Sequence, residues 1–166
     1  MVDQALFRTA MSKLGAAVSV VTSDGPAGRC GTTVTAVSSV TDTPATLLVC
    51  INRNSWSNRA LRENGVLCVN VLSWGQEEVA QLFAGMTDIA PEARMDNVSY
   101  ETLVTGAPAL TQALVSFDCV IAEAVEVGTH TIFLAEVRDI RIGEAQTGLV
   151  YFNRRYISVG ADTQVH

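Results

Sequence analysis

Hydrophobic and polar residues alternate along much of this chain, and the alternation predicts strands. Between residues 32 and 40, valines are interleaved with threonines and serines. This period of two is typical of a strand with one buried face. By the same pattern we expect further strands over residues 16–22, 46–51, 66–72, 114–127, 131–142 and 149–152. The long run at 114–127 should bend around 122–124, and the strand at 32–40 should pair antiparallel with the one at 16–22.

A period near 3.6 predicts a first helix over residues 4–14. Asp3 is a suitable N-cap and Gly15 a suitable C-terminal stop. The apolar residues of one face follow i, i+3, i+4, i+7 spacing: Phe7, Ala10, Met11 and Leu14.

Two shorter helices are expected in the middle of the chain. One covers 58–64, with Ser55 or Ser57 as N-cap and Gly65 as its stop. The other follows a capping box at 73–76 and ends at Gly85. Residues 86–97 show no regular pattern and are expected to form a mobile excursion over the surface.

The order of these elements predicts the fold class. Helices are mostly missing between successive strands, whereas a parallel sheet would require them. We therefore expect a mainly β protein, an antiparallel barrel with a few short peripheral helices. The 166 residues contain no repeat, linker or low-complexity tract, so one domain over 1–166 is expected.

Composition restricts the function. A hydrophobic content of 48% with 17% charged residues favours a packed core. The net charge of −6 disfavours a nucleic-acid surface, which needs clustered lysine and arginine. No signal-peptide pattern and no membrane-spanning run is present, and Cys30, Cys50, Cys68 and Cys119 form no C-x-x-C pair. We expect a cytoplasmic protein with reduced thiols and no membrane partner.

Residues 52–58, NRNSWSN, combine an arginine, hydroxyls, amides and a helix start. Helix N-termini bind phosphate, and arginine can clamp it. The neighbouring strand is rich in small residues and can let a flat ring lie against its backbone. Together they form a candidate seat for a phosphorylated aromatic ligand. The alternative is a β-hairpin with a polar exit loop.

Other familiar sites are missing. Gly25, Gly28 and Gly31 match neither G-x-G-x-x-G nor a P-loop. With His166 at the end of the chain, His130 is the one well-placed histidine, so no metal site is expected. No G-x-S-x-G elbow is present. His130 lies in a turn at 128–130 and is either a site residue or a solvated turn residue.

Seven stretches, in this order, carry a resemblance to a known family: FRTAMSKLGAAVSVVTSDGPAGRCG, TAVSSVTDTPATLLVCINRNS, LCVNVLS, LFAGMT, ALVSFDC, VGTH and GLVYFNRRY. They extend from near residue 7 to near residue 156. The chain resembles the short flavin reductases that serve two-component flavin monooxygenases. The resemblance implies an FMN-binding split β-barrel of Greek-key type that forms a homodimer, with the flavin near the subunit interface.

The resemblance also implies an activity and a set of site residues. The family reduces FMN, FAD or riboflavin with NADH or NADPH and passes the reduced flavin to a partner monooxygenase. The flavin ring would be lined by Thr33, Val34, Thr35 and Ala36, although relatives often carry a smaller residue at Val34. The ribityl chain and phosphate would lie along Cys50, Ile51, Asn52, Arg53, Asn54 and Ser55. One side would be closed by Phe83, Ala84 and Gly85. The nicotinamide nucleotide would meet His130, Phe152 and Tyr156.

Hydride transfer between two cofactors requires stacking and exclusion of water, and no side-chain acid or base on the transferred atom. No catalytic residue is therefore expected, and exchangeable FMN is favoured over a fixed group. Two alternatives remain open. One is a non-catalytic flavin carrier; the other is an enzyme resembling pyridoxamine-phosphate oxidase, which usually needs more basic residues around a second phosphate.

Overall fold

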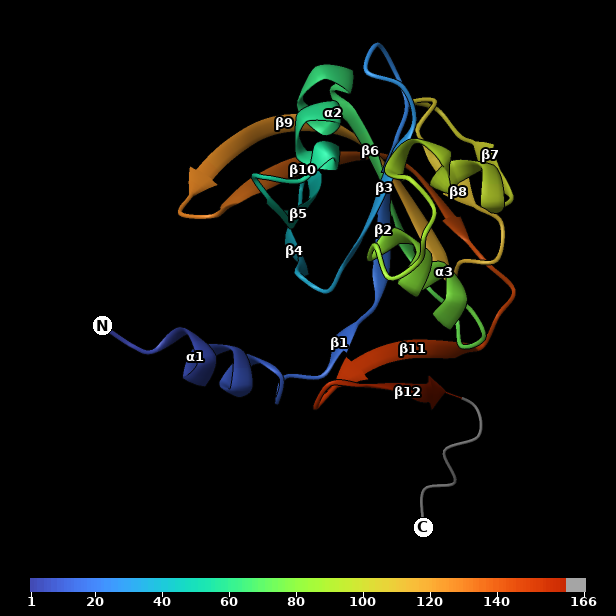
Figure 1. Ribbon diagram of the computed structural model, residues 1–166. Helices are drawn as coiled ribbons and strands as arrows, with labels where there is room; N and C mark the ends of the chain where they lie inside the picture. Colours follow the sequence, from blue (N-terminus) through green and yellow to red (C-terminus); the bar gives the residue numbers. More distant parts are fainter. Residues whose placement is uncertain (161–166) are drawn as a thin grey trace.

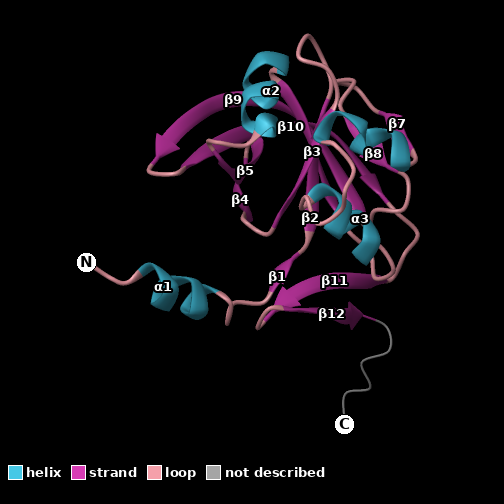
Figure 2. Cartoon of the chain, viewed as in Figure 1, coloured by secondary structure: helices cyan, strands magenta, loops and turns pink. Residues whose placement is uncertain are grey.

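The computed structural model describes residues 1–160, and His166 lies outside them. The protein is mainly β and its paired strands are antiparallel (Figures 1 and 2). The main sheet has the order β3-β2-β6-β9-β10-β5-β4. Its strands are β2 (Ser19–Ser23), β3 (Cys30–Val34), β4 (Val37–Asp42), β5 (Ala45–Asn52), β6 (Val66–Val71), β9 (Val115–Val127) and β10 (His130–Ile142).

Two smaller sheets and the helices surround this sheet. A three-stranded sheet contains β1 (Ala16–Ala17), β11 (Thr147–Phe152) and β12 (Arg155–Gly160); a two-stranded one contains β7 (Tyr100–Thr102) and β8 (Pro108–Leu110). The helical segments are α1 (Gln4–Met11), α2 (Trp56–Asn64), α3 (Glu77–Phe83) and the 3₁₀ segment η1 (Pro91–Asn97). In Figure 1, α1 and the β11–β12 hairpin form a separate layer beside the main sheet.

The expected single strand over residues 32–40 is wrong, because the chain breaks at Thr35 and Ala36. The amide of Val37 donates to the carbonyl of Thr35 (3.0 Å), a tight turn that redirects the chain. Before the break β3 pairs with β2, as expected; after it, β4 pairs with β5. Hydrogen bonds do not join β3 to β4 in the described chain, so the ladder is open at this point.

The core lies inside the curved sheet and follows the alternation of its strands. On β5, Leu47, Val49 and Ile51 are buried, in a cluster that also contains Leu61 of α2. The intervening residues face away from this cluster and are only partly buried or exposed. A second cluster packs α3 and η1 against β2 and β11.

Helix α1 begins where the sequence predicts but ends earlier and is not buried. The Asp3 carboxylate accepts from the amide of Leu6 (2.9 Å), which confirms the N-cap. The helix ends at Met11 with Ser12 as C-cap, so Gly15 is not its stop. None of its residues is buried, and Phe7 on the apolar face is 59% exposed.

Helix α2 confirms both predicted boundary signals. It starts at Trp56, and the Ser55 hydroxyl accepts from the amide of Asn58 (3.1 Å). It ends at Gly65, whose φ of 71° is the left-handed conformation that favours glycine after a helix.

The segments around α3 differ from the expectations. Only half of the capping box forms: the Gln76 side chain accepts from the amide of Ser73 (2.9 Å), while the Ser73 hydroxyl donates to Gln112 and to Gln76 itself. The segment 86–97, expected to be irregular, contains η1 and buries Met95.

The predicted bend of the long strand is confirmed by a register shift beside Ala122, where Glu123 and Ile121 face consecutive residues of β10. No helix in residues 1–160 is long and apolar enough to span a membrane.

Candidate functional site

The register of β5 and β10 brings two distant parts of the predicted site together. Asn52 lies opposite His130, and Cys50 lies opposite Ile132. Residues that face each other across a ladder point to the same side of the sheet. The side chains of Val49 and Ile51 point to the opposite side, into the buried core cluster. The side that carries Asn52 and His130 is therefore free to meet a ligand.

A pocket of about 240 Å³ forms on this side, between the end of β3 and the end of β5. We call it the β3–β5 pocket. Its lining is Thr32, Thr33, Val34, Thr35, Ala36, Cys50, Ile51, Asn52, Ser55 and His130. The structure thus brings His130 beside eight of the residues expected at the flavin. Thr32 is the one lining residue that the sequence reasoning missed.

The β3 wall of this pocket offers mainly backbone. The Thr33 hydroxyl donates to the carbonyl of Ala80 (2.7 Å), which ties β3 to α3. In the described chain β3 has β2 as its one hydrogen-bonded neighbour, so its other edge is unpaired. Unpaired amide and carbonyl groups beside small side chains can bond the edge of a flat heteroaromatic ring.

The turn before β10 holds His130 at the rim. The Thr129 hydroxyl oxygen lies 2.8 Å from Nδ1 of His130, and Nε2 has no hydrogen-bond partner among residues 1–160. The amide of Arg53 donates to the carbonyl of Thr129 (2.9 Å) and joins the turn to the loop after β5. His130 is exposed and therefore accessible to a second ligand.

A second pocket of about 460 Å³ adjoins the first, and Ser55 lines both. We call it the arginine pocket; it is lined by Arg53, Asn54, Ser55, Trp56, Asn58, Arg59, Arg62 and Glu126. The first turn of α2 opens here, where amide groups and the helix dipole favour an anion. The arginines at 59 and 62 were missed, although their spacing of one helical turn in the sequence was a usable signal.

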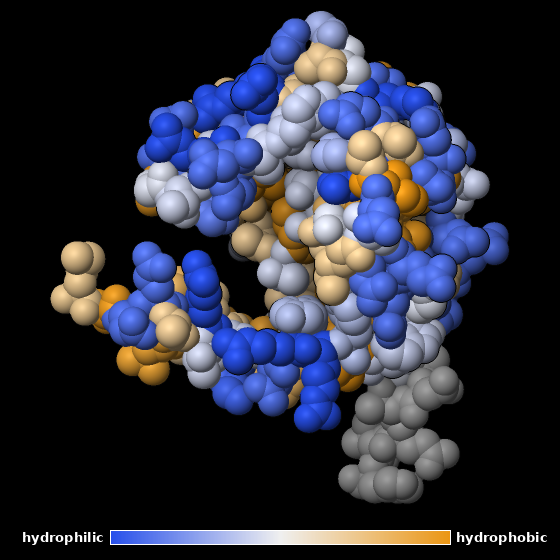
Figure 3. All heavy atoms as spheres, viewed as in Figure 1, coloured by the Kyte–Doolittle hydropathy of each residue, from blue (hydrophilic) through white to orange (hydrophobic). Residues whose placement is uncertain are grey.

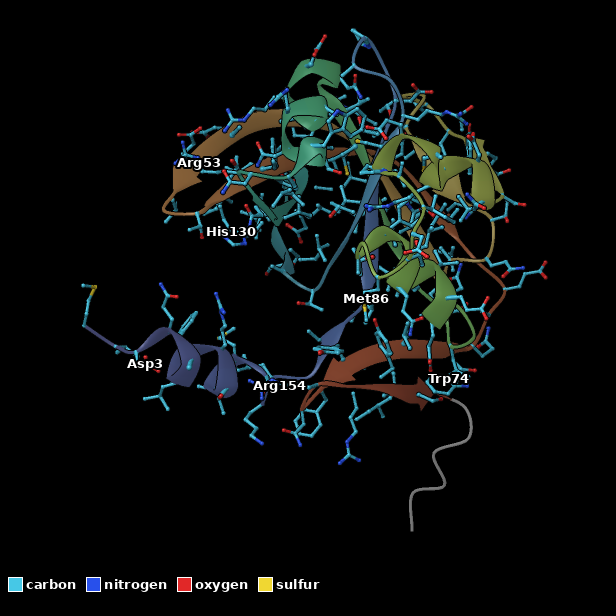
Figure 4. The ribbon with its side chains drawn as sticks, viewed as in Figure 1. Asp3, Arg53, Trp74, Met86, His130 and Arg154 are labelled. Carbon is cyan, nitrogen blue, oxygen red and sulfur yellow. The ribbon has the colours of Figure 1, made fainter. Side chains whose placement is uncertain are left out.

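Arg53 lies in the arginine pocket with its side chain already engaged. Its guanidinium forms an ion pair with Glu126 (3.0 Å) and donates to the carbonyl of Gly128 (3.1 Å). Figure 4 shows Arg53 and His130 close together at the same end of the sheet.

The residues expected to close one side do not line either pocket. Phe83 is 2% exposed and packs behind β3, where a Cβ on Gly31 would lie 2.6 Å from its ring. Gly31 is therefore required for this close approach. Ala84 and Gly85 follow on the surface at the end of α3.

The C-terminal hairpin faces the site from the other layer. Phe152 is partly exposed, and Tyr156 packs edge-on against Tyr151 with ring centres 5.5 Å apart. Burial raises the pKa of Tyr156, and Tyr151 and Glu77 add to the effect.

A third pocket separates this hairpin and the end of α1 from the β3–β4 break. It has a volume of about 490 Å³ and is lined by Tyr151 and Arg154 on one side and by Thr35 and Ala36 on the other. Thr35 and Ala36 also line the β3–β5 pocket, so the two pockets adjoin at the β3–β4 break. Figure 3 shows the hollow, and Figure 4 places Arg154 across it from His130. Phe152 and Tyr156 line none of these pockets.

The donor set suits an organic ligand better than a metal. No cluster of histidine, cysteine and acidic residues within residues 1–160 could hold a metal ion. The four cysteines are free thiols, of which Cys50 lines the β3–β5 pocket. Burial raises the pKa of Cys50 as well, so a neutral thiol faces the pocket. The β3–β5 pocket thus offers neutral hydroxyl, amide and backbone groups, and the adjoining arginine pocket offers three arginines. This arrangement fits a flat ring that carries a phosphate.

Comparisons with known proteins show which family the chain resembles. Residues 11–160 match the family described as flavin reductase like domain. The chain is 52% identical over 153 residues to the 4-hydroxyphenylacetate 3-monooxygenase reductase component of Pseudomonas aeruginosa, covering 92% of this chain and 90% of the relative. It is 52% identical over 155 residues to FMN reductase (NADH) RutF of Escherichia coli K12, covering 93% of each. The fold is similar to the crystal structure of a flavin reductase from Haemophilus somnus, with a TM-score of 0.90 and 44% sequence identity. The match covers 95% of this chain and 100% of the other.

Proposed function

This chain belongs to the flavin reductase-like domain family, and from that premise we propose that the β3–β5 pocket and the arginine pocket together bind one flavin. The protein is an oxidoreductase that reduces flavin with NADH or NADPH. The observation that carries the proposal is the meeting of the two pockets at Ser55. It lets one ligand place a flat ring on β3 and a phosphate at α2.

Different residues bind the ring, the ribityl chain and the phosphate of the flavin. The ring lies against Thr33, Val34, Thr35 and Ala36, where the unpaired edge of β3 supplies backbone hydrogen bonds. The ribityl chain passes Cys50, Ile51 and Asn52. The phosphate reaches Ser55 and the arginines beside the first turn of α2. FMN, with its terminal phosphate, uses both pockets, whereas riboflavin uses the first one.

The nicotinamide nucleotide would bind beside the flavin ring. His130 contacts it from the rim, and Phe152 and Tyr156 approach from the β11–β12 hairpin. When both ligands are bound, a hydride passes from the nicotinamide to the flavin. The protein would hold the two rings together and exclude water, so a catalytic acid or base is not needed.

The proposal includes a homodimer of split β-barrels. Helix α1 supports it, because the apolar side chains Leu6, Phe7 and Met11 on this one helix are all exposed. Exposed apolar faces of this kind are typical of an interface. A second copy that covers α1 would also shield the third pocket, which α1 lines through Arg8 and Met11.

The reduced flavin passes to a partner monooxygenase. One relative is named the reductase component of a monooxygenase, which implies a second protein that uses its product. The free thiols support a reducing cytoplasmic location.

Turnover assays test this proposal. Purified protein is incubated with NADH, and its oxidation is followed by absorbance with and without added FMN. We expect oxidation only when flavin is present. Binding of FMN without NADH oxidation would favour a flavin carrier instead. Oxidation of pyridoxamine phosphate would favour the oxidase alternative.

A further inference from the structure

A single carboxylate joins two of the arginines in the arginine pocket. One oxygen of Glu126 lies 3.0 Å from the guanidinium of Arg53, and the other lies 2.9 Å from that of Arg62. The three residues come from different elements: the loop after β5, helix α2 and the end of β9. An anionic group bound between these arginines would therefore have to displace or share the Glu126 carboxylate.

Both arginines keep their positions through other contacts. Arg62 donates to Asn58 (3.1 Å) and to the Thr131 hydroxyl (3.1 Å), and it lies over the ring of Phe133 at 5.9 Å. Arg53 donates to the carbonyl of Gly128. Removal of the Glu126 charge would thus leave two oriented guanidinium groups in place, each with donors free for a ligand.

Glu126 itself is held only at the surface. Its side chain is 49% exposed, and exposed ion pairs are weak. A phosphate carries more charge and accepts from both guanidinium groups, so it can displace the carboxylate. The displaced carboxylate remains nearby and repels the phosphate, because both are negative.

We propose that Glu126 is a specificity-determining residue that competes with the flavin phosphate for Arg53 and Arg62. It lowers the affinity for FMN without lowering that for riboflavin, and it thereby keeps the phosphorylated flavin exchangeable. This inference rests on the proposed function, because it takes the arginine pocket as the phosphate site.

The test is a comparison of FMN and riboflavin dissociation constants in wild type and in Glu126→Gln. The substitution preserves size and removes the charge. We expect FMN to bind about two- to thirtyfold more tightly, the range implied by the loss of two exposed ion pairs. Riboflavin affinity should change less than about twofold, since it has no phosphate to place between the arginines.

Glu123→Gln is the matched control. Glu123 lies on the same strand, is exposed, and does not line the arginine pocket, so its replacement changes the net charge equally. It should leave the ratio of FMN to riboflavin affinity unchanged. Adding Arg53→Ala to Glu126→Gln should remove most of the gain, because the freed guanidinium is then missing.

Failures of the two proposals are distinguishable. If wild type binds neither flavin, the proposed function is wrong, and this inference is overturned with it. If riboflavin binds normally while the FMN-to-riboflavin ratio of Glu126→Gln equals that of Glu123→Gln, only the role of Glu126 is overturned. Riboflavin binding also reports that each variant is folded.

Discussion

Replacement of His130 by alanine tests whether the turn before β10 binds the nicotinamide nucleotide. His130 lies opposite Asn52 across the ladder and lines the β3–β5 pocket at its exposed rim. The Thr129 hydroxyl engages Nδ1, so Nε2 is the nitrogen available to a ligand. His130→Ala removes this contact and leaves the backbone register of β10 unaltered.

The expected magnitude follows from one lost hydrogen bond. A neutral bond contributes about 0.5–1.5 kcal/mol and a bond to a charged group about 1.5–3 kcal/mol. At about 1.4 kcal/mol per factor of ten, the KM for NADH should rise between about twofold and about 150-fold. A rise near the lower end indicates a bond to the ribose or carboxamide, and one near the upper end a bond to the pyrophosphate. FMN affinity should stay within about twofold of wild type, because the ring and phosphate keep their other contacts.

Thr129→Val is the matched variant, because it keeps the shape of the side chain and removes the hydroxyl that holds Nδ1. It should raise the KM for NADH less than His130→Ala does, since the imidazole remains but is less well oriented. Steady-state kinetics with NADH and FMN varied separately measure both effects. An unchanged KM for NADH in His130→Ala would refute the reasoning and make His130 a solvated turn residue.

Three further predictions concern stability and assembly. Asn70→Leu should lower the free energy of unfolding, measured by chemical denaturation, by about 2–4 kcal/mol. The reason is that the buried Asn70 side chain accepts from the amide of Leu110 at 2.8 Å. A loss below about 0.5 kcal/mol would contradict this. Burial raises the pKa of Cys30 and Cys119 to about 12 from 9.0, so only the unfolded thiols ionise between these pH values. The free energy of unfolding should therefore fall as pH rises from about 9 towards 12. Cys119→Ala should weaken this fall, and a pH dependence of stability equal to that of wild type would count against the reasoning. Phe7→Glu should convert the proposed dimer into monomers in light scattering, whereas a wild-type monomer would remove the proposed role of α1.

Local signals in the sequence predicted those parts of the fold that short-range chemistry decides. Asp3 and Ser55 are helix caps because their side chains accept from amides three residues on. Gly65 ends α2 because it adopts a positive φ without strain. The bend at Ala122 was visible as an interruption of the alternation in β9. Each of these features depends on residues that are neighbours in the chain.

Features decided by distant residues were not predicted. Alternation gives the face of a strand but not its partner, so the switch from β2 to β5 at Thr35 appeared as one continuous strand. Likewise, the sequence pattern of α1 predicts an apolar face but does not show what covers it, and within this chain no residue of α1 is buried.

The same distinction between neighbouring and distant residues applies to the candidate site. The resemblance located most of the β3–β5 pocket, because those residues lie in two short stretches of sequence. The pairing of Arg53 with Glu126 depends on the fold of the β9–β10 hairpin, and no local pattern indicates it.

The net charge of −6 and the arginine pocket act on an anionic ligand in opposite directions. Salt screens exposed charges over about 8–10 Å at physiological ionic strength, so most of the distant acidic residues contribute little at this pocket. What remains are three arginines and Glu126, a local excess of positive charge that the carboxylate reduces. The affinity for a phosphate is therefore decided by these few side chains and not by the overall composition. If the arginine pocket is the phosphate site, as proposed, its partly neutralised arginines would let it bind FMN and release it after reduction, as a reductase that supplies another enzyme requires. Full exposure of all three guanidinium groups would favour retention of the flavin instead.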